Sequence, residues 1–161
     1  MKKSMAAAFA LLAGCVSGGM KHAELKSSMQ ALKSEEGRIY FYRTGSIFGV
    51  AVQADIYLNG AVVGASQPGG FFYVERPAGK YEAHASTEVS RMVTFTLDPG
   101  ETKYIRSYVS MGILVGHVNL ELVNADEAEK QLESLSYTGP SPVPPAAAAK
   151  SADAAPAAQA Q

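Results

Sequence analysis

Residues 51–65, AVQADIYLNGAVVGA, decide the fold class of this chain. Asn59 and Gly60 separate two short segments that are rich in β-branched and aromatic side chains. An Asn-Gly pair tolerates positive φ at both central positions of a type I′ turn, whose twist matches that of paired strands. We therefore predict an antiparallel hairpin, with strands at Ala51–Leu58 and Ala61–Ala65.

The same pattern continues on both sides of this hairpin. Short segments with strand composition recur about every 8–12 residues, and turn signals such as Asp98-Pro99-Gly100 separate them. No helical periodicity lies between them, which argues against parallel βαβ units. The fold class that we predict is all-β, an antiparallel β-sandwich of about seven or eight strands, with a small barrel as the alternative. The other predicted strands are Arg38–Arg43, Phe71–Glu75, Lys80–Ser86, Arg91–Leu97, Thr102–Met111 and His117–Val123.

One short C-terminal helix follows the last predicted strand. Asn124 is a good helix N-cap, and the two acidic residues after Ala125 suit the positive end of a helix dipole. Ala128, Leu132 and Leu135 form an apolar stripe at helical spacing. We expect this helix to lie on an edge or a face of a sheet.

The N-terminus has the features of an exported lipoprotein. Lys2 and Lys3 precede an apolar stretch, Met5–Ala13, which is too short to span a bilayer. The stretch ends in Leu12, Ala13, Gly14 and Cys15, which match a bacterial lipobox, and Cys15 is the only cysteine of the chain. We predict that residues 1–14 are a cleaved signal peptide and that Cys15 is lipidated. The alternatives are an ordinary signal peptide and a buried first helix.

Three further segments complete the predicted organisation. Residues 15–36 form the lipidated cysteine and a tether, in which Leu25, Met29 and Leu32 have helical spacing and can dock on the domain. Residues 37–137 contain 13 of the 14 aromatic residues, so the hydrophobic core and the β-sandwich with its helix belong there. Residues 138–161 are rich in alanine and proline, and we expect them to be disordered.

The composition and the anchor restrict location and partners. A lipid chain at Cys15 makes the membrane a partner and places the chain in the cell envelope. Val16 stands where aspartate commonly retains lipoproteins in the inner membrane. This favours the periplasmic face of the outer membrane, with the outer face of the inner membrane as the alternative. The net charge of −1 argues against nucleic acid as a partner.

We find no constellation of residues that indicates catalysis. The three histidines, His22, His84 and His117, lack the close spacing typical of metal ligands, so we predict no metal and no cofactor. No G-x-S-x-G nucleophile motif is present. Glu75 and Glu82 flank a turn, where they would face each other across a hairpin as a solvated pair. We therefore predict that the protein is not an enzyme.

Two features of the sequence favour a binding surface. Tyr40, Tyr42, Tyr104 and Tyr108 lie in predicted strands and could form an aromatic face that stacks on sugar rings or binds a peptide. The alternative is that these tyrosines cover a thin core. The glycine-bounded segment Gly112–Gly116 is apolar, and we expect it to pack inward, with an exposed contact patch as the alternative.

Several stretches, taken in order, resemble the bacterial family called domain of unknown function 2846. They are residues 37–43 (GRIYFYR), 55–60 (DIYLNG), 70–74 (GFFYV), 77–81 (PAGKY) and 104–106 (YIR). The turn at residues 77–81 also resembles PEGA-type domains, which are small β-sandwiches on cell surfaces. The resemblance implies an envelope-associated β-domain. It brings no established activity and no catalytic residues.

The function that we predict is a lipid-anchored envelope protein with a non-catalytic binding or structural β-domain. Its expected partners, besides the membrane, are an envelope protein or peptidoglycan. Two alternatives stay open. One is an enzyme or enzyme accessory that acts on cell-wall glycan or peptide, and the other is a subunit of an envelope assembly.

Overall fold

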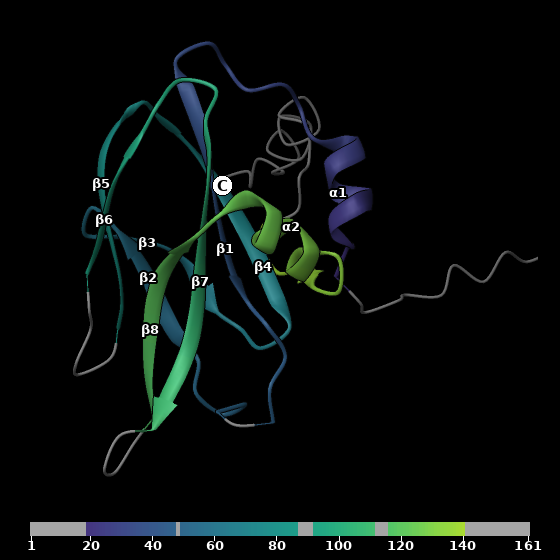
Figure 1. Ribbon diagram of the computed structural model, residues 1–161, viewed down its shortest axis with the longest axis vertical. Coiled ribbons are helices and arrows are strands. Elements are labelled where there is room, and N and C mark those ends of the chain that lie inside the picture. The colour runs from purple at the N-terminus through teal and green to yellow at the C-terminus, as the bar shows by residue number, and fades with distance from the viewer. Residues whose placement is uncertain (1–18, 48, 87–91, 112–115, 141–161) are drawn as a thin grey trace, which may run out of the picture.

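Two β-sheets and two short helices make up the part of the chain that the computed structural model describes, residues 19–47, 49–86, 92–111 and 116–140 (Figure 1). The first sheet has the strand order β8-β7-β1-β4-β9, and the second has the order β3-β2-β5-β6. The first sheet comprises β1 (Glu36–Arg43), β4 (Gly70–Pro77), β7 (Thr102–Met111), β8 (Gly116–Val123) and β9 (Ser136–Tyr137). The second comprises β2 (Ala54–Leu58), β3 (Ala61–Ser66), β5 (Gly79–Ala85) and β6 (Val93–Leu97).

The predicted sandwich is confirmed, but its first sheet is not wholly antiparallel. β1 pairs with β4 and β7 pairs with β8 in antiparallel ladders, whereas β1 pairs with β7, and β4 with β9, in parallel. β1 and β7 become parallel neighbours because the chain leaves the first sheet after β1 and β4 and builds β5 and β6 in the second sheet before it returns. Turn signals identify hairpins between successive strands, so they carry no information about this long-range pairing.

The hairpin that opens the second sheet forms as predicted at its turn. Asn59 and Gly60 both have positive φ, 48° and 80°, and β2 and β3 pair in an antiparallel ladder. The prediction of a strand from Ala51 was wrong at its start, because β2 begins at Ala54. A register shift between Ile56 and Tyr57 interrupts the ladder, which fits the extra twist that a β-bulge introduces.

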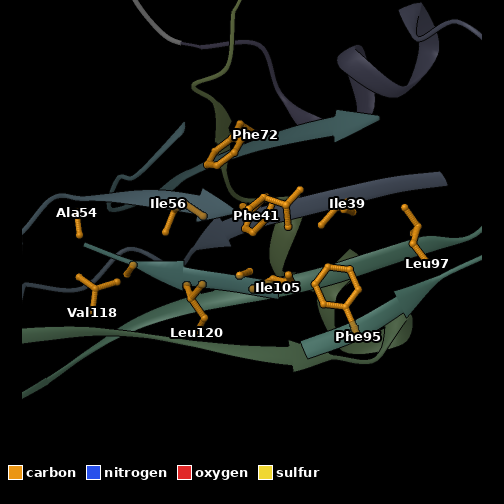
Figure 2. Close-up of a cluster of buried hydrophobic side chains, with 13 residues drawn as sticks. Ile39, Phe41, Ala54, Ile56, Phe72, Phe95, Leu97, Ile105, Val118 and Leu120 are labelled. Atoms are coloured by element: carbon orange, nitrogen blue, oxygen red, sulfur yellow. The ribbon is translucent and has the colours of Figure 1, made fainter. Parts of the chain in front are cut away.

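The main core lies between the inner faces of the two sheets (Figure 2). Successive strand side chains point to opposite faces, so Ile39 and Phe41 of β1 point inward together with Ile105 of β7. The second sheet contributes Ile56, Leu58, Phe95 and Leu97, as the alternating pattern predicts for β6. Phe41 lies opposite Phe72 of β4, and their rings stack with centroids 5.1 Å apart.

A second core lies on the other face of the first sheet, beneath the helices α1 (His22–Ser28) and α2 (Ala125–Leu132). In Figure 1 both helices lie on the side of β1 and β4 away from β5 and β6. α2 begins at Asn124, whose Oδ1 accepts a hydrogen bond from the Glu127 amide at 2.9 Å, as predicted. Its predicted stripe, Ala128, Leu132 and Leu135, is buried. The helix therefore covers a face of the sheet rather than an edge.

The segment expected to be a tether contributes to this second core. Leu25 of α1 is fully buried, and Met29 packs partly buried against the same cluster. Lys21 forms an isolated bridge with Ser136 of β9. The predicted patch thus docks on the domain through Leu25 and Met29, but the helix ends at Ser28, so Leu32 lies beyond it and outside both core clusters. In the described part of the chain, neither helix has the length and apolar character needed to cross a membrane.

Candidate functional site

Four of the predicted functional residues lie outside the described part of the chain. They are the lipobox residues Leu12, Ala13, Gly14 and Cys15. Residues 112–115 of the apolar glycine-bounded segment also lie outside it. The remaining candidates can be placed in the structure.

The predicted aromatic face is not an exposed surface. Tyr40, Tyr42 and Tyr104 are buried beneath α1 and α2, while Tyr108 is 41% exposed beyond the helices. The expectation of a four-tyrosine ligand-binding face is therefore wrong for the three buried residues. The three tyrosines are buried because the helices cover the outer face of the first sheet. The alternative, that the tyrosines cover a thin core between two sheets, is also not met, because Tyr40, Tyr42 and Tyr104 pack in the second core beneath the helices.

The buried tyrosines form a packed aromatic cluster with polar contacts at its edge. The rings of Tyr40 and Tyr104 stack with centroids 5.4 Å apart. The Tyr104 hydroxyl donates to Oε1 of Glu129 at 2.5 Å, and Lys26 Nζ donates to Oε2 of the same carboxylate at 3.1 Å. Burial raises the pKa of Tyr40 and Tyr42 to about 12. Through its contacts with Tyr104 of β7 and Lys26 of α1, Glu129 of α2 links these three elements.

Burial would raise the pKa of the Glu129 carboxyl, but the hydrogen bonds from Tyr104 and Lys26 outweigh it and lower the pKa. Tyr104 shows the opposite shift, because burial and its hydrogen bond to Glu129 both raise the pKa of the hydroxyl. Tyr104 thus holds its proton and Glu129 its negative charge at neutral pH. The pair is a fixed hydrogen bond that fastens α2 to the sheet.

His22, which lies in the predicted tether, is a buried member of this cluster. Its ring packs edge-on against Tyr40 and Phe71, with centroids 5.6 Å and 5.5 Å apart. Nδ1 lies 3.8 Å from Glu129 Oε2, and Nε2 has no hydrogen-bond partner among the described residues. The spacing of His22 and Leu25 on one helix face was the available signal, since residues three apart share a face.

We expect His22 to make stability depend on pH. Burial lowers the pKa of His22, against the opposing effect of Glu129, so the unfolded chain takes up this proton at a higher pH than the folded one. The free energy of unfolding should therefore fall as pH drops below the unfolded pKa of about 6.5, by at most about 1.4 kcal/mol per pH unit. Urea unfolding between pH 8 and pH 5 measures this, with His22→Gln expected to show a flatter profile. Parallel profiles for the two proteins would contradict the assignment.

Arg43 is a buried cation at the end of β1. Its Nη1 donates to the Val52 carbonyl at 2.6 Å, and its Nη2 donates to the Gly49 carbonyl at 2.7 Å. In the described part of the chain, no carboxylate lies within 4 Å of this guanidinium. Burial lowers the pKa of Arg43. The Arg43 guanidinium thus stabilises the backbone of the segment that connects β1 to β2.

Two surface hollows are candidates for partner contact. One, of about 230 Å³, lies beside the end of β1 and is lined by Arg43, Ser107 and Tyr108 among others. Ser107 there shares a buried hydrogen bond with Ser66 at 2.8 Å. The other, an open groove of about 460 Å³, lies over β5 and β6. Asn59 at its rim is engaged with the backbone, since its Oδ1 accepts from the Glu82 amide at 2.9 Å.

The residues weighed for metal and acid–base chemistry do not converge. Glu75 and Glu82 do not face each other across a hairpin, because β4 and β5 belong to different sheets. Glu75 instead accepts a hydrogen bond from Arg38 at 2.6 Å. His84 stacks on Tyr57 with centroids 4.9 Å apart. Within residues 19–47, 49–86, 92–111 and 116–140, no three His, Cys, Asp or Glu residues lie close enough to hold a metal ion.

Comparison with known proteins gives one family and one relative. The model of the family described as "Protein of unknown function (DUF2846)" matches residues 33–118, from just before β1 into β8. An uncharacterized protein of Haemophilus influenzae is 30% identical over 130 residues, which cover 78% of this chain and 77% of the relative. No solved structure matches significantly.

The match to the family model includes most of both sheets but not the helical layer. α1 precedes the matched residues, while α2 and β9 follow them. The five stretches that carry the resemblance fall within the match and supply β1, β2, the start of β4, the turn into β5 and part of β7. The chain belongs to the family described as protein of unknown function (DUF2846).

Proposed function

We propose that this protein is a lipid-anchored protein of the cell envelope whose β-sandwich is a non-catalytic binding or structural module. The observation that carries the proposal is the lipobox, Leu12-Ala13-Gly14-Cys15, after a short positively charged and apolar leader. The expected location is the periplasmic face of the outer membrane. Two or more acyl chains at Cys15 would make the attachment stable without any membrane-spanning helix.

The docking of the N-terminal segment supports this role. Cys15 lies only four residues before Gly19, and the Met20 carbonyl accepts a hydrogen bond from the Tyr137 amide at 2.8 Å. An anchor at Cys15 would therefore be attached to the folded body by a short connection rather than by a long flexible tether. Such a connection holds the sandwich close to the bilayer.

Several buried polar side chains are hydrogen-bonded to one another, which supports a non-catalytic module. Tyr104 and Glu129 are committed to each other, and Ser66 and Ser107 share a buried hydrogen bond. The open groove over β5 and β6 offers Lys80, Glu82 and two threonines to a polar partner. An envelope protein or peptidoglycan is the partner class that we propose for it.

The turn between β4 and β5 is the segment that carries the proposed likeness to PEGA-type surface domains. The Tyr81 hydroxyl donates to the Pro77 carbonyl at 2.7 Å, which closes the Pro-Ala-Gly-Lys-Tyr turn. This hydrogen bond stabilises the turn, which connects β4 of the first sheet to β5 of the second.

Fatty-acid labelling tests the anchor. Cells that express the full chain should incorporate labelled palmitate into it, and the protein should fractionate with membranes. Cys15→Ser should lose the label completely, because the thiol that accepts the diacylglyceryl group is absent. Ser17→Ala, which leaves the lipobox intact, should keep it. An unlabelled wild-type protein, or label retained in Cys15→Ser, would remove the anchor from the proposal.

A further inference from the structure

We propose that the end of the sandwich formed by the β1–β2 connection lies on the membrane surface, with Ile47 and Val50 in the lipid interface. The inference rests on the lipid anchor of the proposed function, and it adds which surface of the domain the bilayer contacts. Ile47 is 89% exposed and Val50 is 53% exposed. In Figure 1 this connection lies at the lower end of the sandwich, near the end of β7.

The anchor segment and this connection lie at the same end of the first sheet. Met20 accepts a hydrogen bond from Tyr137 of β9, and β9 pairs with Gly70 and Phe71 at the start of β4. Gly70 in turn pairs with Arg43, the last residue of β1. Strands lie about 4.8 Å apart, so three such steps separate the anchor segment from the start of the connection by about 15 Å.

The length of chain before the described residues sets how far the lipid can be. Gly19 lies four residue steps after Cys15, and a fully extended chain spans at most about 3.6 Å per step, or about 14 Å here. The acyl chains must therefore enter the bilayer beside β9. A bilayer at that position meets the neighbouring end of the sandwich rather than the distant Asn59-Gly60 turn.

The surface of the connection has the chemistry that lipid contact requires. Its described residues, 44–47 and 49–53, include no charged side chain. Arg43 fixes the backbone by donating to the carbonyls of Gly49 and Val52. A glycine at position 49 allows close packing on Val109, since an added Cβ would lie 3.0 Å from that side chain. The loop therefore presents Ile47 and Val50 to solvent instead of folding them inward.

A bilayer fits this small patch better than a protein does. The surface area of two exposed apolar side chains is far smaller than the roughly 800 Å² that each partner buries in a specific protein interface. A covalent anchor changes the requirement, because it raises the local concentration of the membrane so that weak contacts are occupied. The patch is large enough to orient a tethered domain, although it is too small to dock a free one.

Tryptophan fluorescence provides a direct test, because the chain contains no tryptophan. Full-length Ile47→Trp is purified in its lipidated form and reconstituted into phosphatidylethanolamine–phosphatidylglycerol vesicles with brominated acyl chains. The control is Val62→Trp, at an exposed apolar position of β3 beside the distant turn (55%, against 89% for Ile47). We expect the emission at position 47 to shift to the blue and to be quenched at least about twofold more than at position 62, as for a ring in the interface.

The outcomes separate this inference from the anchor itself. The mass of the purified N-terminal peptide is measured first, and a mass without acyl chains on Cys15 would contradict the proposed function. With the acyl mass present, equal quenching at the two positions, or stronger quenching at position 62, would overturn the orientation. A blue shift at position 47 without quenching would also overturn it, because it would indicate burial against protein, such as a second copy of the chain.

Discussion

Leu132→Ala should lower the free energy of unfolding by about 2–5 kcal/mol. Leu132 ends α2, is fully buried, and packs in the cluster that also holds Leu25 and Tyr104. Its replacement removes buried methyl groups and leaves a cavity between the helix and the sheet. The helical layer lies outside the residues that the family model matches, so a large effect would show that it is integral to this domain. Urea unfolding followed by circular dichroism measures the loss.

The matched control is Lys130→Ala, on the same helix and exposed to solvent. Its expected effect is within about 0.5 kcal/mol, since surface substitutions away from special contacts change stability little. If Leu132→Ala were as mild as Lys130→Ala, the helix would not be packed on the sheet. A biphasic transition in the wild-type protein would instead mean that the helical layer unfolds separately from the sandwich.

The sequence predicts those parts of the fold that depend on local signals. The Asn59-Gly60 turn, the strand over Thr102–Met111 and the helix cap at Asn124 all form as expected. Each depends on residues close together in the chain. The parallel pairing of β1 with β7 was not predictable in this way, because it joins residues more than sixty positions apart and depends on how the two sheets close on each other.

The aromatic face shows why the candidate site was harder to predict. Alternation correctly places Tyr40 and Tyr42 on the face of β1 opposite Ile39 and Phe41, but it does not reveal what covers that face. The cover comes from α1, which precedes β1 in the sequence, and α2, which follows β8, and both fold against the same sheet. Leu122 shares a strand face with the buried Leu120, yet it is 44% exposed, so alternation alone does not decide burial there either. Burial of one face is thus a tertiary property.

Phe72→Ala is the second substitution with a large expected effect, about 3–5 kcal/mol of unfolding free energy. Phe72 is buried in the core between the sheets, where its ring stacks on Phe41 of the neighbouring strand. It also fills the space above Gly64 of β3, since a Cβ at position 64 would lie 2.5 Å from the ring. Removal of the ring would therefore open a cavity between the two sheets. Chemical unfolding at constant pH measures the change.

A double-mutant cycle with Gly64→Ala tests whether this contact is the cause. Alone, Gly64→Ala should destabilise the protein by about 1–3 kcal/mol, because the added methyl overlaps the Phe72 ring. In the Phe72→Ala background the ring is absent and the same methyl enters the vacated space, so its cost should fall. The two effects should then be non-additive by about 0.5–3 kcal/mol. Additive effects would mean that the two sheets do not meet at Gly64 and Phe72, which would contradict the closure of the sandwich at this point.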